Sequence, residues 1–312
     1  MFDIQPTIIR FEQKNYPALL REIKDPPAKI YVYGREEILQ RPWPVAMVGA
    51  RMMTEYGQRA ARKIAGELAG LGVVVVSGLM YGIDTEAQVA AMEGGGESIG
   101  VLGFGVNNFF PSTHEQLAKK WIRRGNLVLV SEYPPEVFPQ PWTFLQRNRI
   151  VAGLSKAVVV VEAAAQSGSL VTARLAGECG REVMAVSGGI FNKFAEGTKN
   201  LLNQGALLVS SGEDIKQEIT GRTYRGRVIG IPKVLKIEDK REAKKKVVGW
   251  KREEVSELGW RIGELLKKYK QGLTSDELQK ILGARVEELQ IELMELELGC
   301  KVKLERNNYV LF

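Results

Sequence analysis

Histidine and cysteine are almost absent from this sequence, and their scarcity limits its chemistry. The 312 residues contain one histidine, His114, and two cysteines, Cys179 and Cys300. Two cysteines cannot form a disulfide framework, and neither lies at a spacing typical of metal ligands. We therefore expect neither a metal site nor a catalytic triad built on histidine.

Long apolar runs are also missing. No stretch reaches the length needed to cross a membrane, and the start MFDIQPTIIRFEQ lacks the charged-then-apolar order of a signal peptide. We therefore expect a cytoplasmic protein that has no membrane partner. The chain is long enough for one large core and a small second domain.

The net charge of +7 is concentrated in one segment. Residues 221–251 contain 11 Lys or Arg and 3 Asp or Glu, whereas the rest of the chain holds 33 basic and 34 acidic residues. The segment has no sustained amphipathic period, so it is interpreted as a basic linker or as a merely solvated run of charge. Nucleic-acid binding elsewhere must therefore depend on local clusters of charge.

A repeated pattern of strand, glycine turn and helix occupies residues 45–220. Six apolar, mostly β-branched runs predict strands that are covered on both faces: 45–49, 73–78, 98–105, 126–133, 157–163 and 182–188. Alternating βα units of this kind predict an α/β fold with a doubly wound, mostly parallel, Rossmann-like sheet. Residues 1–44 are interpreted as an N-terminal extension that packs on this main domain.

Residues 252–312 predict a small winged-helix domain. An amphipathic segment, a capping box that begins at Thr274 and a third helix over 284–298 precede a hairpin pattern at Asn307. The third helix, which would enter the DNA groove, has one arginine and five glutamates. Because phosphate contacts dominate DNA affinity, so acidic a helix predicts a protein-interaction or dimer-supporting domain. Binding of duplex DNA by the isolated domain at physiological salt would contradict this prediction.

Ligands of an open α/β sheet bind beyond the carboxyl ends of its strands, where the strand order reverses. The predicted strand ends are rich in glycine and serine, which let backbone N–H groups approach an anion. The segment SGSLVTA is the best cradle for an anion, because Ser167, Gly168 and Ser169 open a helix with hydroxyls and unpaired amides.

Two arginines stand in FLQRNRIVAGLS, directly before an apolar run that resembles a buried strand. An unpaired buried guanidinium is costly, so Arg147 and Arg149 need either acidic partners, such as Glu132 or Glu162, or an anionic ligand. Together with Arg51, they would supply planar cations suited to phosphate. The common nucleotide motifs are incomplete, since GFGVNN lacks the third glycine of the dinucleotide fingerprint and no Walker A sequence is present. No cofactor is therefore expected.

Seven segments resemble the DNA-processing protein A (DprA/Smf) family, in the same order and at the same spacing. They are VAMVGAR, VVVVSGLMYGID, VLGFGVNNFFP, LVSEYPP, FLQRNRIVAGLS, VVVEAAAQSGSLVTA and GTKNLLNQGA. The resemblance implies an extended Rossmann fold that binds single-stranded DNA without strong sequence preference. It also implies a homodimer without enzymatic activity that loads the RecA recombinase in natural transformation.

Carried over position by position, the resemblance implies a site for single-stranded DNA. Such a site needs cations along the strand and an aromatic face for a base, which Arg147 and Phe144 would provide. Asn148 would hydrogen-bond locally and fix the turn. The family's usual histidine after GID is replaced by Gln88. The implied site comprises Gly49, Arg51, Ser77, Gly78, Phe144, Arg147, Asn148, Arg149, Ser167, Gly168, Ser169, Thr172 and Lys199.

A second hypothesis is a small-nucleotide-binding sensor or a nucleotide hydrolase of the related Rossmann-like superfamily. Nucleoside-monophosphate hydrolases of that group carry PGG-x-GT-x-x-E where this chain has SGSLVTARL, which places Leu175 at the catalytic glutamate. The hydrolase is therefore disfavoured, whereas a sensor that only recognises phosphate needs no carboxylate. A third interpretation is a scaffold protein whose strand ends no longer bind a ligand.

Overall fold

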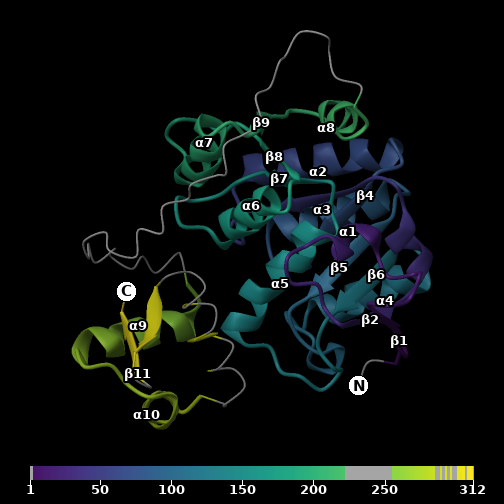
Figure 1. Cartoon of the computed structure of the whole chain (residues 1–312). Coiled ribbons are helices and arrows are strands. Elements are labelled where there is room, and N and C mark those ends of the chain that lie inside the picture. Colours follow the sequence, from purple (N-terminus) through teal and green to yellow (C-terminus); the bar gives the residue numbers. More distant parts are fainter. Residues whose placement is uncertain are drawn as a thin grey trace. The chain divides into compact units, whose positions relative to one another are not determined.

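A nine-stranded sheet organises the larger part of this computed structural model (Figure 1). Its strands run along the sheet in the order β1-β2-β6-β5-β4-β3-β7-β8-β9. They are β1 (Thr7–Arg10), β2 (Lys29–Tyr33), β3 (Pro44–Val48), β4 (Val74–Ser77), β5 (Ser98–Leu102), β6 (Leu127–Ser131), β7 (Ala157–Val160), β8 (Glu182–Ala185) and β9 (Leu207–Leu208).

The chain divides into two compact units, residues 1–237 and 238–312. The basic segment 221–251, apart from Gly221, and most of the predicted third helix over 284–298 lie outside the described residues. The structure describes residues 3–221, 255–284, 301–305 and 308–311, together with Leu289, Glu292, Leu293 and Leu296.

The strand order reverses between β3 and β7. From β3 the chain adds β4, β5 and β6 in parallel on one side, and it then returns to place β7, β8 and β9 in parallel on the other side. Within this sheet, antiparallel pairing is confined to β1 with β2 and β2 with β6. The predicted doubly wound, mostly parallel sheet is therefore confirmed, and the N-terminal segment contributes two strands to the same sheet.

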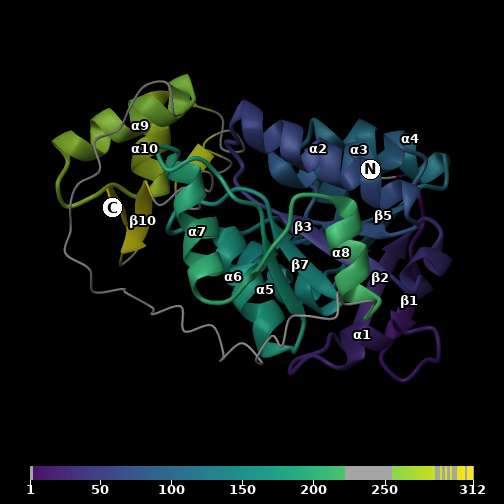
Figure 2. The same ribbon diagram turned by 90° about the horizontal axis from the view of Figure 1, so that it is seen from above.

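Helices cover both faces of this sheet (Figure 2). One face packs against α2, α3 and α8, and the other packs against α1, α5, α6 and α7. The helices of this unit are α1 (Ala18–Arg21), α2 (Glu55–Gly70), α3 (Ile83–Glu93), α4 (His114–Arg123), α5 (Pro141–Gly153), α6 (Gly168–Glu178), α7 (Glu196–Asn203) and α8 (Gly212–Ile219), with short 3-10 turns at Glu36–Gln40, Val106–Asn108 and Lys193–Ala195.

Both faces of the central strands are buried, which explains their uninterrupted apolar sequences. Along β3, Met47 packs with Ile64 of α2, whereas the next residue, Val48, belongs to the core on the opposite face with Ile150 of α5. Successive side chains of a strand point to opposite faces, so a strand covered on both sides needs an apolar residue at every position.

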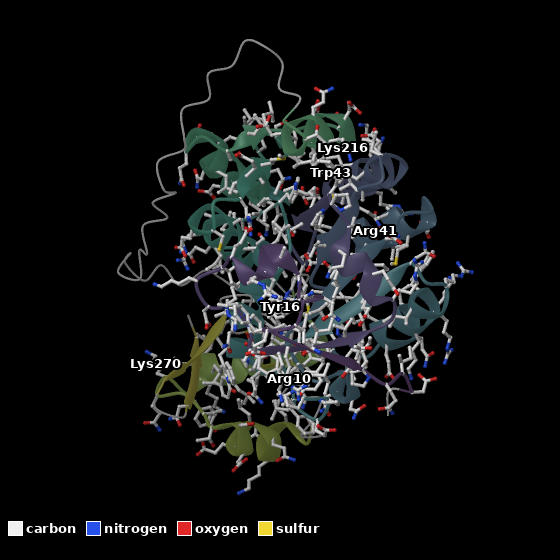
Figure 3. All side chains as sticks on the ribbon, turned by 45° about the vertical axis from the view of Figure 1, so that its right-hand side comes forward. Arg10, Tyr16, Arg41, Trp43, Lys216 and Lys270 are labelled. Atoms are coloured by element: carbon white, nitrogen blue, oxygen red, sulfur yellow. The ribbon has the colours of Figure 1, made fainter. Side chains whose placement is uncertain are left out.

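At the amino-terminal edge of the sheet, Trp43 lies directly before β3 and beside α8 (Figure 3). The ammonium groups of Lys156 and Lys216 lie 4.4 and 4.6 Å from its ring centroid. These contacts attach α8 to the start of β3 through cation–π attraction. Within the described ranges, no helix is long and apolar enough to cross a membrane.

In the smaller unit, the described residues form the helices α9 (Glu257–Lys268) and α10 (Ser275–Leu282) and a hairpin of β10 (Val302–Glu305) and β11 (Asn308–Leu311). Thr274 forms the predicted capping box, with its hydroxyl accepting from Glu277 N–H at 3.2 Å. Leu273 pairs with Tyr309, so the segment between the helices joins the hairpin as a third, single-residue strand. These elements agree with the predicted winged helix.

Candidate nucleic-acid interface

The strand order reverses between β3 and β7, and we call the two loops that follow the carboxyl ends of these strands the rim. Ala50 N–H donates to Glu162 O at 2.8 Å, which holds the two loops together beyond the strands. Gly49 is required here, because a Cβ at this position would lie 2.7 Å from Ile83 Cγ1 and 2.8 Å from Glu162 O. Gly49 therefore permits close packing of the rim.

The predicted cradle lies at the start of α6, beside this rim. Ser167 is the N-cap, and its hydroxyl accepts from Ser169 N–H at 3.3 Å. Gly168 is exposed, and an added Cβ there would meet nothing within 4 Å. Ser169 and Thr172 are buried behind it. The cradle thus presents Ser167 and Gly168 at the positive end of an 11-residue helix, which favours an anion.

Ser77 and Gly78, at the end of β4, make internal hydrogen bonds. The Ser77 hydroxyl is buried and donates to Met47 O at 2.6 Å. Gly78 N–H donates to Asp84 Oδ2 at 3.0 Å, and Gly78 O accepts from Arg147 Nη1 at 3.0 Å. These two residues therefore hold together the buried segments that lie beneath the rim.

Arg147 lies in the middle of α5, which corrects the expectation that it stands at the edge of a strand. Its side chain is only 4% exposed and donates to the carbonyl oxygens of Gly78 and Val101. Burial lowers the pKa of Arg147 to about 10, although Asp84 opposes this shift. Burial likewise raises the pKa of Asp84, against the effect of Arg147. The guanidinium therefore bonds to the interior of the unit, which does not favour the expected phosphate contact.

Arg149 is also held internally. Its Nη2 donates to Glu132 Oε1 at 2.6 Å, and its Nε lies 3.2 Å from Asp25 Oδ2. This is the acidic pairing that the sequence left open for the two arginines. Asn148 lies half-buried within the same helix, so it does not fix a turn.

Phe144 is buried as well, which does not favour its expected role in base stacking. Only 2% of the residue is exposed, and its ring packs against Phe104 and Phe110 at centroid distances of 6.0 and 5.8 Å. The ring lies beneath the half-buried Arg51, whose Cζ is 5.9 Å from its centroid, so the Arg51 side chain covers it.

Two of the predicted cations remain at the surface of the rim. Arg51 follows β3, and Gly82, with φ of 79°, packs against its backbone carbonyl in a conformation that favours glycine. Lys199 is exposed on α7, whose first turn donates from Gly197 N–H to Ala163 O at 2.8 Å. Both cations therefore stand on segments that are bonded to the rim.

Glu162, which was expected only at a strand end and as a possible acidic partner of the arginines, is a central residue of the rim. It is 1% exposed and accepts from Thr54 N–H at 2.9 Å, from the Thr54 hydroxyl at 2.6 Å and from Asn192 Nδ2 at 2.9 Å. Thr54 is the N-cap of α2. One buried carboxylate therefore connects the start of α2 with the loop after β8. An acidic residue directly after a buried strand was the available signal.

A family model described as DNA recombination-mediator protein A matches residues 7–220. The chain belongs to this family. DNA processing protein DprA of Bacillus subtilis (strain 168) is 40% identical over 217 residues, which are 70% of this chain and 72% of that protein. Protein Smf of Escherichia coli (strain K12) is 44% identical over 212 residues, which are 68% of this chain and 56% of that protein.

Solved structures of this recombination-mediator family share the fold. DNA processing protein A of Streptococcus pneumoniae has a TM-score of 0.65 and 37% identity, and the match covers 70% of this chain and 75% of that one. The protein of Helicobacter pylori, whose structure addresses its unique single-stranded DNA binding mode, has a TM-score of 0.63 and 28% identity over 71% and 99% of the two chains. The resemblance drawn from the sequence is confirmed.

Gln88, which stands where the resemblance implied a histidine, is fully buried. Its Oε1 accepts from Leu79 N–H at 3.0 Å, and its Nε2 donates to Ser98 Oγ at 3.0 Å and Ile99 O at 3.1 Å. Leu79 has a φ of 54°, a strained conformation for a branched side chain. His114 Nδ1 lies 3.0 Å from Leu79 O, so two side chains fix this strained residue.

Proposed function

We propose that this protein is a non-enzymatic recombination mediator that binds single-stranded DNA at the rim. In this proposal it acts as a homodimer and loads the RecA recombinase during natural transformation. The family match over residues 7–220 carries the proposal. The single-stranded DNA binding mode described for the Helicobacter pylori relative supports it.

The chemistry of the rim is suited to the backbone of a single strand. The start of α6 presents Ser167 and Gly168, and the cations Arg51 and Lys199 stand on neighbouring segments. Phosphates are attracted by such cations and by the N-terminal end of a helix, regardless of base sequence. In this proposal the other predicted residues shape the rim without touching the strand: Gly49, Ser77, Gly78, Phe144, Arg147, Asn148, Arg149, Ser169 and Thr172.

Replacing Arg51 and Lys199 together by alanine should weaken binding to an oligo-dT strand and reduce its salt dependence. Each phosphate contact contributes about 0.7 to the slope of log K against log salt for single strands, so the loss of two should reduce the slope by about 1.4. Fluorescence anisotropy over a salt series measures this slope. The matched control replaces Lys120 and Arg124, which lie at the end of α4 away from the rim. Equal slopes for the two double variants would contradict the proposed site.

Two further readouts of the same proteins separate the hypotheses. The wild type should shorten the lag of RecA filament assembly on single strands, and the Arg51 and Lys199 double variant should lose this effect. A small-nucleotide sensor predicts the opposite binding pattern, with strong mononucleotide binding and negligible affinity for oligo-dT.

We also propose that the smaller unit contacts protein rather than DNA. Glu292, one of the five glutamates of the predicted third helix, is 8% exposed, and burial raises its pKa. It packs against Gly259, where an added Cβ would lie 2.2 Å from Glu292 Oε1. At least one of these acidic groups therefore belongs to the interior of the unit.

A further inference from the structure

The loop after β8 exposes two adjacent apolar side chains. Phe191 is 97% exposed and Ile190 is 84% exposed, which makes them the most exposed large apolar residues of the described part of the chain. Single exposed apolar residues are common on protein surfaces and need no explanation. Two neighbouring apolar side chains that are almost fully exposed, in a loop that follows the carboxyl end of a strand, do need an explanation.

The turn that carries Phe191 is fixed by hydrogen bonds on both sides. Asn192 N–H donates to Gly189 O at 3.0 Å and closes the turn. The Asn192 side chain accepts from Phe194 N–H at 2.9 Å and donates to the buried carboxylate of Glu162 at 2.9 Å. The backbone turn that carries the exposed ring is therefore already ordered. Little conformational entropy of this turn is lost when a ligand binds.

This turn lies beside the cradle and the start of α2. The Tyr56 hydroxyl, in the first turn of α2, donates to Ser187 O at 2.6 Å. On the other side, Ala163 N–H, in the loop that leads to the cradle, donates to Phe194 O at 2.6 Å. Figure 1 shows β7, β8, α6 and α7 as neighbours. The loop that carries the ring is therefore bonded both to the start of α2 and to the loop that leads to the cradle.

Charge around the turn matches the same ligand. Lys193 follows Phe191 by two residues and is exposed, and Lys199 is exposed on the next helix. Glu196 is the acidic residue between them and is also exposed, so the segment 187–203 carries only a small positive excess. A weak positive field beside a bare aromatic ring suits a ligand that combines a flat apolar face with a phosphate, which is the nucleotide unit of an unpaired strand.

We infer that Phe191 is a stacking platform for an unpaired base of the bound strand. This inference rests on the proposed binding of single-stranded DNA. Bases in a duplex are covered by their neighbours, so a platform of this kind selects single strands over duplex. It reads the face of a base, so it tolerates any sequence.

Two oligonucleotides of equal length and charge test the inference, one of dT and one of abasic tetrahydrofuran units. Stacking on one aromatic ring changes the affinity by about 5- to 100-fold, so the wild type should prefer dT by at least about 5-fold. Phe191→Ala should lose this preference and keep the wild-type affinity for the abasic strand. Phe191→Trp should keep the preference, and dT should quench its added indole fluorescence. Ile8→Ala, on β1 away from the rim, is the exposed apolar control.

The results separate the two levels of the proposal. If Phe191→Ala keeps the wild-type preference for dT, or loses affinity for both strands equally, the stacking role is overturned. If the wild type binds neither strand, the proposed function itself fails. If the ring instead contacts a protein partner, Phe191→Ala should leave DNA binding unchanged. That result would also overturn the inference.

Discussion

Replacing Arg147 by alanine is expected to lower the free energy of unfolding by about 3–5 kcal/mol, the usual cost of removing one partner from a buried charged pair. The change would leave the carbonyl oxygens of Gly78 and Val101 without their donor. It would also leave Asp84 buried without the cation that opposes its raised pKa. Urea unfolding followed by circular dichroism measures the loss.

Two comparisons make this result interpretable. Arg62→Ala removes a guanidinium from the surface, where it bonds Glu86 and Glu93, and should cost less than about 1 kcal/mol. Arg147→Lys keeps the charge but not the planar guanidinium. Its loss of unfolding free energy should therefore lie between those of Arg147→Ala and Arg62→Ala. An Arg147→Ala protein with wild-type stability that no longer binds oligo-dT would restore the direct DNA contact that the sequence suggested.

Replacing Glu162 by alanine should lower the free energy of unfolding by about 3 kcal/mol, because three donors lose a buried acceptor. The expected effect is also local, since Glu162 joins the Thr54 cap of α2 to Asn192 of the loop after β8. Release of Asn192 should free the turn that carries Phe191. Limited chymotrypsin digestion should therefore cleave after Phe191 faster in the variant than in the wild type.

Glu162→Gln is the matched control for this prediction. Its amide keeps the volume and one acceptor oxygen, so stability and cleavage should lie between those of the wild type and the alanine variant. Unchanged cleavage after Phe191 in Glu162→Ala would show that the turn does not depend on this carboxylate.

The sheet could be predicted from the sequence because its central strands are buried on both faces. Runs such as VVVVSG and AVVVVEA have no alternation to interpret, and the glycines after them mark the turns. The interpretation of the apolar end of FLQRNRIVAGLS as a strand was wrong, because these residues resemble a strand but most of them belong to a helix. The structure extends a helix from Pro141, a favourable first helical residue, to Gly153.

The roles of the site residues could be predicted only in part. The cradle at Ser167 and Gly168 follows from local sequence, because a serine before a helix is a capping signal. Burial of Phe144 and Arg147 depends on Phe104, Asp84 and other partners far away in the sequence. The exposure of Phe191 is equally a tertiary property, and Gly188-Gly189 before it signals only a turn.

The pairing of β3 with β7 has a consequence for the order in which the chain folds. Val45 aligns with Ala157, so the rim joins two halves that are far apart in the sequence. Closing so long a loop costs entropy before the new contacts repay it, whereas the pairings from β3 to β6 need only short closures. A nascent chain that ends before residue 157 therefore lacks the rim, however well its first strands have folded.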